Sequence, residues 1–247
     1  MFSQVFLGVT GREMERFHPK KVAYMACHFS SGGTGLSNLP QQLPEGSVLL
    51  VDDSMPVQGH DPETVAGQLT ELVNRFSPRA VLLDFQRPQS KETDGMFAAI
   101  SEALPCPVAA TPVYAIGRDC PVFLPPVAVN KPLEPYLRPW LKRGVFLEIA
   151  PETARFTVTK EGCISCPAPW ENSLPAEVKR LHCHYREEAF PGKVVFTVTR
   201  TREDLGNLCR EGYDLGIWGA VGLYRELVEW NGTQTVPCRS DAPRSPL

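Results

Sequence analysis

The sequence predicts an α/β fold, a (β/α)8 barrel of the TIM type. Short apolar runs alternate with amphipathic stretches of helical spacing, and several runs are apolar throughout, as in parallel strands covered on both faces. The 247 residues hold about eight such runs, the number that a TIM barrel places in roughly 250 residues. An open doubly wound sheet is the alternative, but the glycine-rich turn at 31–35 lacks the dinucleotide-binding spacing and the Walker lysine.

The first half of the chain alternates most regularly. We expect buried strands at 22–28, 47–52 and 80–85 because each run is apolar almost throughout. A helix at 61–76 begins with Asp61 as cap and Pro62 in the first turn, and its apolar residues recur at helical spacing. The strand at 47–52, this helix and the strand at 80–85 form a strand–helix–strand unit, and a second helix is expected after it, from about Ser90 to 104.

The second half is less regular, since prolines interrupt several apolar runs. We expect a β-hairpin or flap inserted near 155–190, where Arg155–Lys160 alternates like a half-exposed strand. One domain covers residues 1–235, and the Pro-, Ser- and Arg-rich tail at 236–247 is expected to be disordered. The further elements expected are strands at 108–114, 122–129, 144–149, 193–199 and 215–220, and helices at 133–142, 201–211 and 223–230.

Composition and charge exclude several classes of protein. Lys and Arg number 25 against 28 Asp and Glu, a net charge of −3 that does not suit a nucleic-acid partner. No apolar run reaches the roughly 18 residues of a membrane span. The apolar run Val5–Val9 is too short for a signal-peptide core. We therefore expect a cytoplasmic protein with reduced cysteines and no membrane partner.

Acidic and aromatic residues gather at the carboxyl ends of the expected strands, where TIM barrels carry their active sites. Carboxylates supply acid–base groups and aromatic faces stack on sugar rings, so this mixture indicates a carbohydrate or a related small polar ligand. No cofactor is expected. The strand-end residues are His28, Asp52, Asp53, Asp84, Gln86, Arg87, Tyr114, Glu148, Glu152, Arg200 and Trp218.

Two short motifs resemble the family 18 glycoside hydrolases, the chitinase-like barrels. Leu82-Leu-Asp-Phe-Gln86 resembles the end of their fourth strand, which carries an Asp two residues before a catalytic Glu. With 4–9 counted as a strand, 80–85 is the fourth here as well. Gly216-Ile-Trp218 resembles their last strand, which presents a Trp on the floor of the sugar site. The resemblance implies Asp84 and Gln86 at the catalytic positions and Trp218 on the floor of the site. The expected strand ends add Asp52, Asp53, Arg87, Tyr114 and Glu148 as substrate-binding residues.

The sequence departs from that family at the position of the acid. Gln86 stands where the family has Glu, and Arg79 and Leu82 replace its earlier aspartates. In the family, the Glu protonates the leaving oxygen while the substrate amide acts as nucleophile, a route outside the usual two-carboxylate scheme. A glutamine does not donate an acid proton. The resemblance therefore implies a barrel that binds sugar without this mechanism, unless Asp52, Asp53, Glu148 or Glu152 supplies a displaced acid.

Two alternatives remain open from the sequence. One is a non-enzymatic protein in which the barrel serves assembly or regulation. The other is a zinc-binding protein that uses Cys163, Cys166, His182 and His184, since a C-x2-C pair is followed after fifteen residues by H-x-H. The H-x-H spacing is shorter than in zinc fingers, and packing or surface roles explain the same residues.

Overall fold

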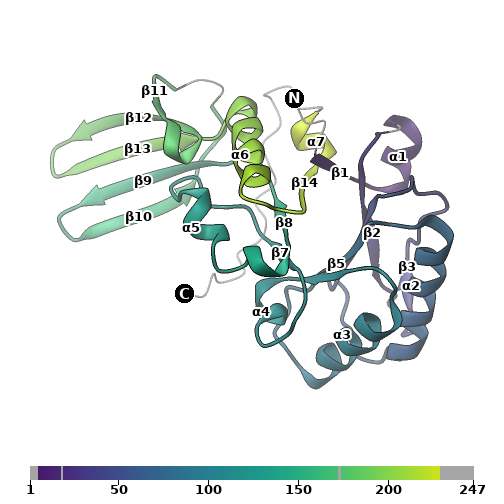
Figure 1. The fold of residues 1–247 in the computed structure, drawn as a ribbon. Helices are drawn as coiled ribbons and strands as arrows, with labels where there is room; N and C mark the ends of the chain where they lie inside the picture. Colours follow the sequence, from purple (N-terminus) through teal and green to yellow (C-terminus); the bar gives the residue numbers. More distant parts are fainter. Residues whose placement is uncertain (1–4, 18, 172–173, 229–247) are drawn as a thin grey trace.

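The chain forms a closed barrel of eight parallel strands (Figure 1). This computed structural model describes residues 5–17, 19–171 and 174–228. β1 pairs in parallel with both β2 and β14, which closes the sheet and excludes the open doubly wound alternative. The predicted TIM-type fold is confirmed. In spatial order the barrel strands are β1 (Val5–Val9), β2 (Val22–Phe29), β4 (Val48–Asp52), β5 (Ala80–Asp84), β6 (Val108–Ala110), β7 (Val122–Leu124), β8 (Val145–Glu148) and β14 (Gly219–Leu223).

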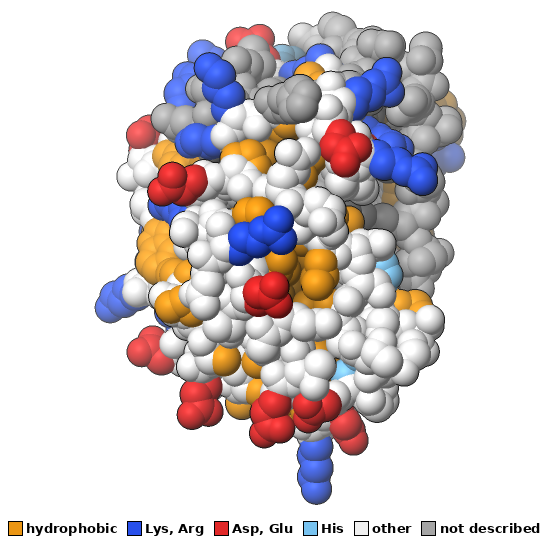
Figure 2. Space-filling view, turned by 90° about the vertical axis from the view of Figure 1, so that its right-hand side faces the viewer, with side chains coloured by type: hydrophobic (Ala, Val, Ile, Leu, Met, Phe, Trp, Pro, Cys, Tyr) orange, Lys and Arg blue, Asp and Glu red, His pale blue; other side chains and the backbone are white. Residues whose placement is uncertain are grey.

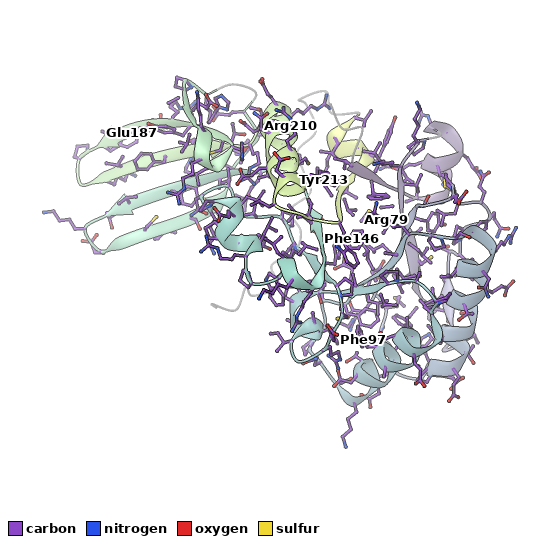
Figure 3. The ribbon with its side chains drawn as sticks, in the orientation of Figure 1. Arg79, Phe97, Phe146, Glu187, Arg210 and Tyr213 are labelled. Carbon is purple, nitrogen blue, oxygen red and sulfur yellow. The ribbon has the colours of Figure 1, made fainter. Side chains whose placement is uncertain are left out.

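The barrel has an inner apolar core and a second apolar layer between strands and helices. Side chains alternate along each strand, so Leu50 and Leu82 point inward while Val51 and Leu83 belong to the outer layer. Phe146 of β8 belongs to the inner cluster (Figure 3). Because both faces of these strands are covered, their sequences are continuously apolar.

The helices cover the outside of the barrel unevenly. The predicted helices at 61–76 and 90–104 are present as α2 (Pro62–Phe76) and α3 (Lys91–Ala103). Asp61 caps α2 by accepting the Thr64 N–H at 2.9 Å, as expected. The connection from β2 to β4 holds the short strand β3 (Leu36–Ser37), antiparallel to β2. The other helices are α1 (Gly11–Phe17), α4 (Pro112–Ala115), α5 (Leu133–Leu137), α6 (Arg202–Asp214) and α7 (Tyr224–Leu227), with 3-10 turns η1 (Leu141–Arg143) and η2 (Lys179–Leu181).

An antiparallel sheet is inserted between β8 and α6 and projects to one side of the barrel (Figure 1). It has five strands in the order β10-β9-β13-β12-β11, so the insertion is larger than the predicted hairpin or flap. It also includes the strand at 193–199, which the sequence alone predicts as a barrel strand. The strands are β9 (Thr153–Thr159), β10 (Gly162–Pro167), β11 (Ala176–Val178), β12 (Cys183–Phe190) and β13 (Lys193–Thr199).

The last barrel strand lies further along the chain than expected. The prediction placed it at 215–220, whereas β14 is Gly219–Leu223. Residues 215–217 close α6 instead, since the N–H groups of Leu215 and Ile217 donate to the carbonyls of Glu211 and Gly212. The expected tail at 236–247 lies outside the described residues.

The face turned to the viewer in Figure 2 has its basic side chains mainly toward the top and its acidic side chains mainly along the lower edge. Apolar side chains on this face form small patches separated by polar atoms. Within the described ranges, no helix has the length and apolar character needed to cross a membrane.

Candidate functional site

Two carboxylates stand side by side at the carboxyl end of the barrel. Asp52 is the last residue of β4 and Asp84 the last residue of β5, and the two are register partners. Leu50 and Leu82, two residues earlier, belong to the inner core, so the alternation of the strands directs both carboxylates inward. Neighbouring strands are about 4.8 Å apart, which makes Asp52 and Asp84 an adjacent acidic pair at the mouth of the barrel.

His28 extends this row onto a third strand. An irregularity between Tyr24 and Cys27 shifts the register of β2, and His28 becomes the partner of Asp52. The His28 Nδ1 atom lies 3.1 Å from the carbonyl oxygen of Ala26. The sequence placed His28 at a strand end but did not include it in the substrate site, because the shift in β2 leaves no signal in an apolar run.

Glu148 faces the acidic pair from the other side of the barrel. It ends β8, which is three strands from β5 and four from β4 in the closed sheet. Phe146, two residues earlier on β8, points into the barrel, so the side chain of Glu148 also points inward. Burial, together with the negative charge of Glu148, raises the pKa of Tyr136 on α5 to about 12. Sequence reasoning missed Tyr136, which a short, proline-flanked helix brings to the mouth.

Gln86 is hydrogen-bonded to Asp84. Its side-chain Nε2 donates to Asp84 Oδ1 at 3.0 Å. Its backbone N–H donates to Asp53 Oδ1 at 2.9 Å, so the neighbouring loop fixes the residue. The carboxamide thus supplies Asp84 with a hydrogen bond and holds no acidic proton.

Asp53 and Arg87 support the loops of the site. Asp53 is 3 % exposed, and its Oδ2 accepts the Arg87 N–H at 2.9 Å. Arg87 Nε donates to the Asp53 carbonyl at 2.7 Å, and its Nη2 donates to the Ser54 carbonyl at 2.8 Å. These bonds tie the loop after β4 to the loop after β5.

Tyr114 lies in the core behind the loops. It is fully buried, and its hydroxyl donates to the Arg87 carbonyl at 2.9 Å. Burial is the main cause that raises the pKa of its phenol. Its ring meets Phe85 edge-on, with centroids 5.5 Å apart. Tyr114 therefore positions the Arg87 loop and presents no surface to a ligand.

Trp218 lies at the opposite end of the barrel, which corrects its predicted place on the floor of the site. It precedes β14, and its N–H donates at 2.7 Å to the carbonyl of Val145, the first residue of β8. Its ring packs edge-on against Phe146 and over Gly144, where a Cβ would come within 2.4 Å of the indole. The sequence does not show at which end of the barrel Trp218 lies, because the apolar run at 215–220 contains both the end of a helix and the start of a strand.

Glu152 and Arg200 lie at the base of the inserted sheet. Arg200 is 1 % exposed, and its guanidinium donates to the carbonyls of Val127 at 2.7 Å and His182 at 3.2 Å. Glu152 Oε2 accepts the Val129 N–H at 2.9 Å. Burial lowers the Arg200 pKa, and the nearby Glu152 carboxylate opposes that shift. Both residues hold the insertion against the barrel.

The structure does not bring together the four residues considered as zinc ligands from the sequence, which are Cys163, Cys166, His182 and His184. Cys163 and Cys166 are three residues apart on β10 and so point to opposite faces. His184 is on β12, separated from β10 by β9 and β13, and its Nδ1 lies 3.0 Å from Asp204 Oδ2. His182 pairs with Glu211. The described residues contain no group of three or more side chains placed to hold a metal ion.

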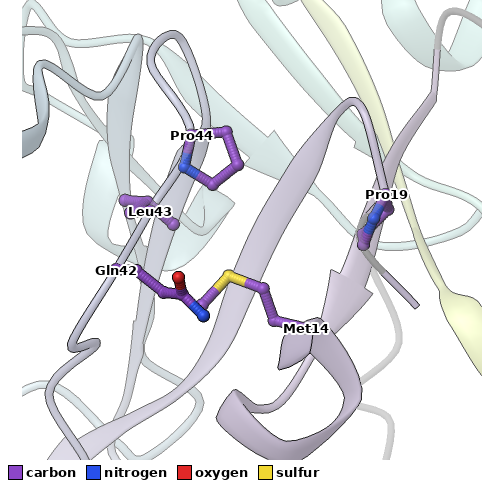
Figure 4. A pocket seen from close by; sticks show the side chains of 5 residues that line it. All are labelled: Met14, Pro19, Gln42, Leu43 and Pro44. Atoms are coloured by element: carbon purple, nitrogen blue, oxygen red, sulfur yellow. The ribbon is translucent and has the colours of Figure 1, made fainter. Parts of the chain in front are cut away.

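A pocket of about 350 Å³ lies away from the acidic mouth (Figure 4). Met14 of α1 lines it with Pro19, which precedes β2, and with residues 42–44, which precede β4. These loops enter the amino ends of the strands. The pocket therefore does not belong to the candidate site.

No protein-family model matches the chain, and no curated protein matches its sequence. The chain is similar in structure to the spore cortex-lytic enzyme SleL of Bacillus cereus, with a TM-score of 0.51 and 10% identity over 88% of this chain and 69% of that one. It is also similar to a chitinase of Chromobacterium violaceum, with a TM-score of 0.50 and 8% identity over 89% of this chain and 93% of that one. This likeness confirms the barrel fold that the resemblance to family 18 implies.

Proposed function

We propose that the carboxyl-terminal mouth of the barrel binds a carbohydrate or a related polar ligand without hydrolysing it by the acid mechanism of family 18. The observation that carries the proposal is the arrangement of Asp52, Asp84 and Glu148, inward-facing carboxylates on both sides of one mouth. Carboxylates accept hydrogen bonds from hydroxyl groups, and acceptors on two walls suit a ligand with hydroxyls on both edges.

The place of Gln86 favours binding over hydrolysis. Its amide donates to Asp84 at 3.0 Å, so a partner of that carboxylate is a hydrogen-bond donor with no acidic proton to transfer. The names of the two structural neighbours, a chitinase and a spore cortex-lytic enzyme, support glycans as the ligand class to test first.

A glycan array followed by titration with chito-oligosaccharides tests the proposal. Asp84→Asn and Glu148→Gln should each weaken binding about tenfold or more, because a hydrogen bond to a charged group is worth about 1.5–3 kcal/mol. Trp218→Ala is the matched control, since Trp218 lies at the other end of the barrel. Absence of glycan binding, or an equal loss in all three variants, would contradict the proposal.

Hydrolysis is measured on the same oligosaccharides by the release of reducing ends. We expect none from the parent chain. If the parent does hydrolyse them, Asp52→Asn and Glu148→Gln identify a displaced acid. Asp53 is a poor candidate for that role, because it is buried and both of its carboxylate oxygens accept backbone N–H groups. Glu152 is another, because it lies at the base of the inserted sheet and accepts the Val129 N–H.

A further inference from the structure

A serine and a histidine meet in the two loops that follow β2 and β4. Ser30 comes directly after Phe29, the last residue of β2, and His60 directly precedes Asp61, the cap of α2. Ser30 Oγ lies 3.4 Å from His60 Nε2. Both residues are partly exposed, so a ligand in solution can reach the pair.

The contacts of His60 fix which ring nitrogen accepts a proton. Its Nδ1 lies 3.1 Å from the carbonyl oxygen of Val57, which only accepts hydrogen bonds. Nδ1 therefore carries the proton and Nε2 presents its lone pair to Ser30. The buried ring of Phe29 meets the imidazole edge-on at a centroid distance of 5.2 Å and holds it in place.

The glycine-rich loop at 31–35 contacts the Ser30 hydroxyl through Thr34, whose Oγ1 lies 3.2 Å from Ser30 Oγ. The Ser30 N–H donates to the Gly35 carbonyl at 2.8 Å, and the Thr34 N–H donates to Ser30 Oγ at 3.1 Å. Gly33 has a φ of +71°, and a Cβ there would meet the Gly59 carbonyl at 3.0 Å, so the two loops pack closely. In the part of the chain that the structure describes, the Gly32 and Gly33 N–H groups donate no hydrogen bond.

We propose that Ser30 is a nucleophile activated by His60 and that this pair hydrolyses carboxylic esters. A nucleophile, a base within hydrogen-bond reach and a third group that orients the base are the geometric parts of such a site. Here the Val57 carbonyl orients the imidazole. The pair lies in loops that follow the carboxyl ends of β2 and β4, at the same end of the barrel as the acidic mouth, and its activity does not depend on the ligand proposed for that mouth.

The reaction balances with water as the only co-reactant. Ser30 Oγ bonds to the ester carbonyl carbon while its proton moves to His60 Nε2. The carbon–oxygen bond to the alcohol breaks, and the alcohol leaves with that proton. Water then attacks the acyl-serine and gives a proton to Nε2. Release of the carboxylic acid returns that proton to Ser30.

The full chain is tested with a fluorophosphonate probe, located by peptide mass spectrometry, and with p-nitrophenyl acetate. We expect the probe on Ser30 in the parent chain and on no residue at this site in Ser30→Ala. His60→Asn should slow ester hydrolysis about a hundredfold, the usual lower range for losing a general base. Ser31→Ala is the control, because Ser31 is the exposed neighbouring hydroxyl.

Circular dichroism and thermal unfolding of each variant show whether it keeps the fold. Parent chain unlabelled at Ser30, or ester hydrolysis unchanged in folded Ser30→Ala, would overturn the proposal. So would equal rates for the parent and folded His60→Asn. If His60→Asn fails to fold, labelling of Ser30 in the parent, lost in Ser30→Ala and kept in Ser31→Ala, decides the matter.

Discussion

Replacing Gln86 by glutamate would place a second carboxylate beside Asp84. The change is nearly isosteric, and it removes the 3.0 Å hydrogen bond from Nε2 to Asp84 Oδ1. Two like charges 4 Å apart repel by about 1 kcal/mol in water and about 4 kcal/mol near a protein surface. Gln86 is exposed, so the lower figure applies. With about 1 kcal/mol for the lost hydrogen bond, Gln86→Glu should lower the free energy of unfolding by about 2 kcal/mol at pH 8.

The charge part of that loss should disappear in acid. Two adjacent carboxyls share a proton, so the pKa of one of them rises above its value in the unfolded chain. A raised pKa gives stability that is complete below the unfolded pKa and is lost as pH rises through the folded one. Gln86→Glu should therefore approach the stability of Gln86→Met, which removes the hydrogen bond without adding charge, at about pH 3.5.

Urea unfolding of the parent, Gln86→Glu and Gln86→Met at pH 3.5 and pH 8 measures both parts. Equal stability of the two variants at pH 8 would refute the placement of Gln86 against Asp84. The same variant also bears on function, because a carboxyl with a raised pKa is a proton donor. If the mouth binds chito-oligosaccharides, Gln86→Glu should release reducing ends that the parent does not.

Three further predictions concern other parts of the chain. Arg200→Met should lower the free energy of unfolding, measured with urea, by about 3 kcal/mol or more, because it removes a buried guanidinium bonded to the carbonyls of Val127 and His182. A loss below about 1 kcal/mol would contradict the role of Arg200 at the base of the inserted sheet. The free energy of unfolding of the parent should fall as pH rises from about 9 toward 12, since burial raises the pKa of the Cys27 thiol to about 12. Cys27→Ala should reduce that fall by up to about 1.4 kcal/mol per pH unit, and an unchanged slope of unfolding free energy against pH would contradict the prediction. Asp61→Ala should lower stability by about 1 kcal/mol through loss of the α2 cap, whereas Asp61→Asn should retain most of it.

The barrel strands that could be predicted are those with no polar face. The runs at 48–52 and 80–84 are apolar because the inner core and the helix layer both cover them, and the aspartate that ends each run marks the carboxyl end of its strand. The sequence therefore assigns Asp52 and Asp84 correctly to the ends of their strands. Glu148 followed from the same pattern on β8.

The errors in the prediction have a common physical cause, which is pairing between distant residues. The strand at 193–199 has a sequence that suits a barrel strand, yet its partners are 153–159 and 184–190 in the inserted sheet. Trp218 lies within an apolar run that spans the end of α6 and the start of β14. Local sequence carries no information on which strand a segment joins.

Contacts between loops were beyond sequence reasoning for the same reason. His60 reads as the residue before a helix cap, and its contact with Ser30 joins loops 30 residues apart. His28 reads as one strand end among several, and only the shifted register of β2 pairs it with Asp52. The contacts of both histidines are set by the pairing of β2 with β4.

The rigidity of the mouth is itself an argument for binding. Asp53 fixes the backbone of Gln86, and Arg87 fastens the Asp53 loop in return. Asp84 accepts a hydrogen bond from the Gln86 side-chain amide. Gln86, which stands at the position of the proton donor, is therefore held as a hydrogen-bond donor by two neighbouring loops. A site whose groups are fixed before the ligand arrives loses little conformational entropy on binding. The same fixed amide offers no route for the proton transfer that hydrolysis requires.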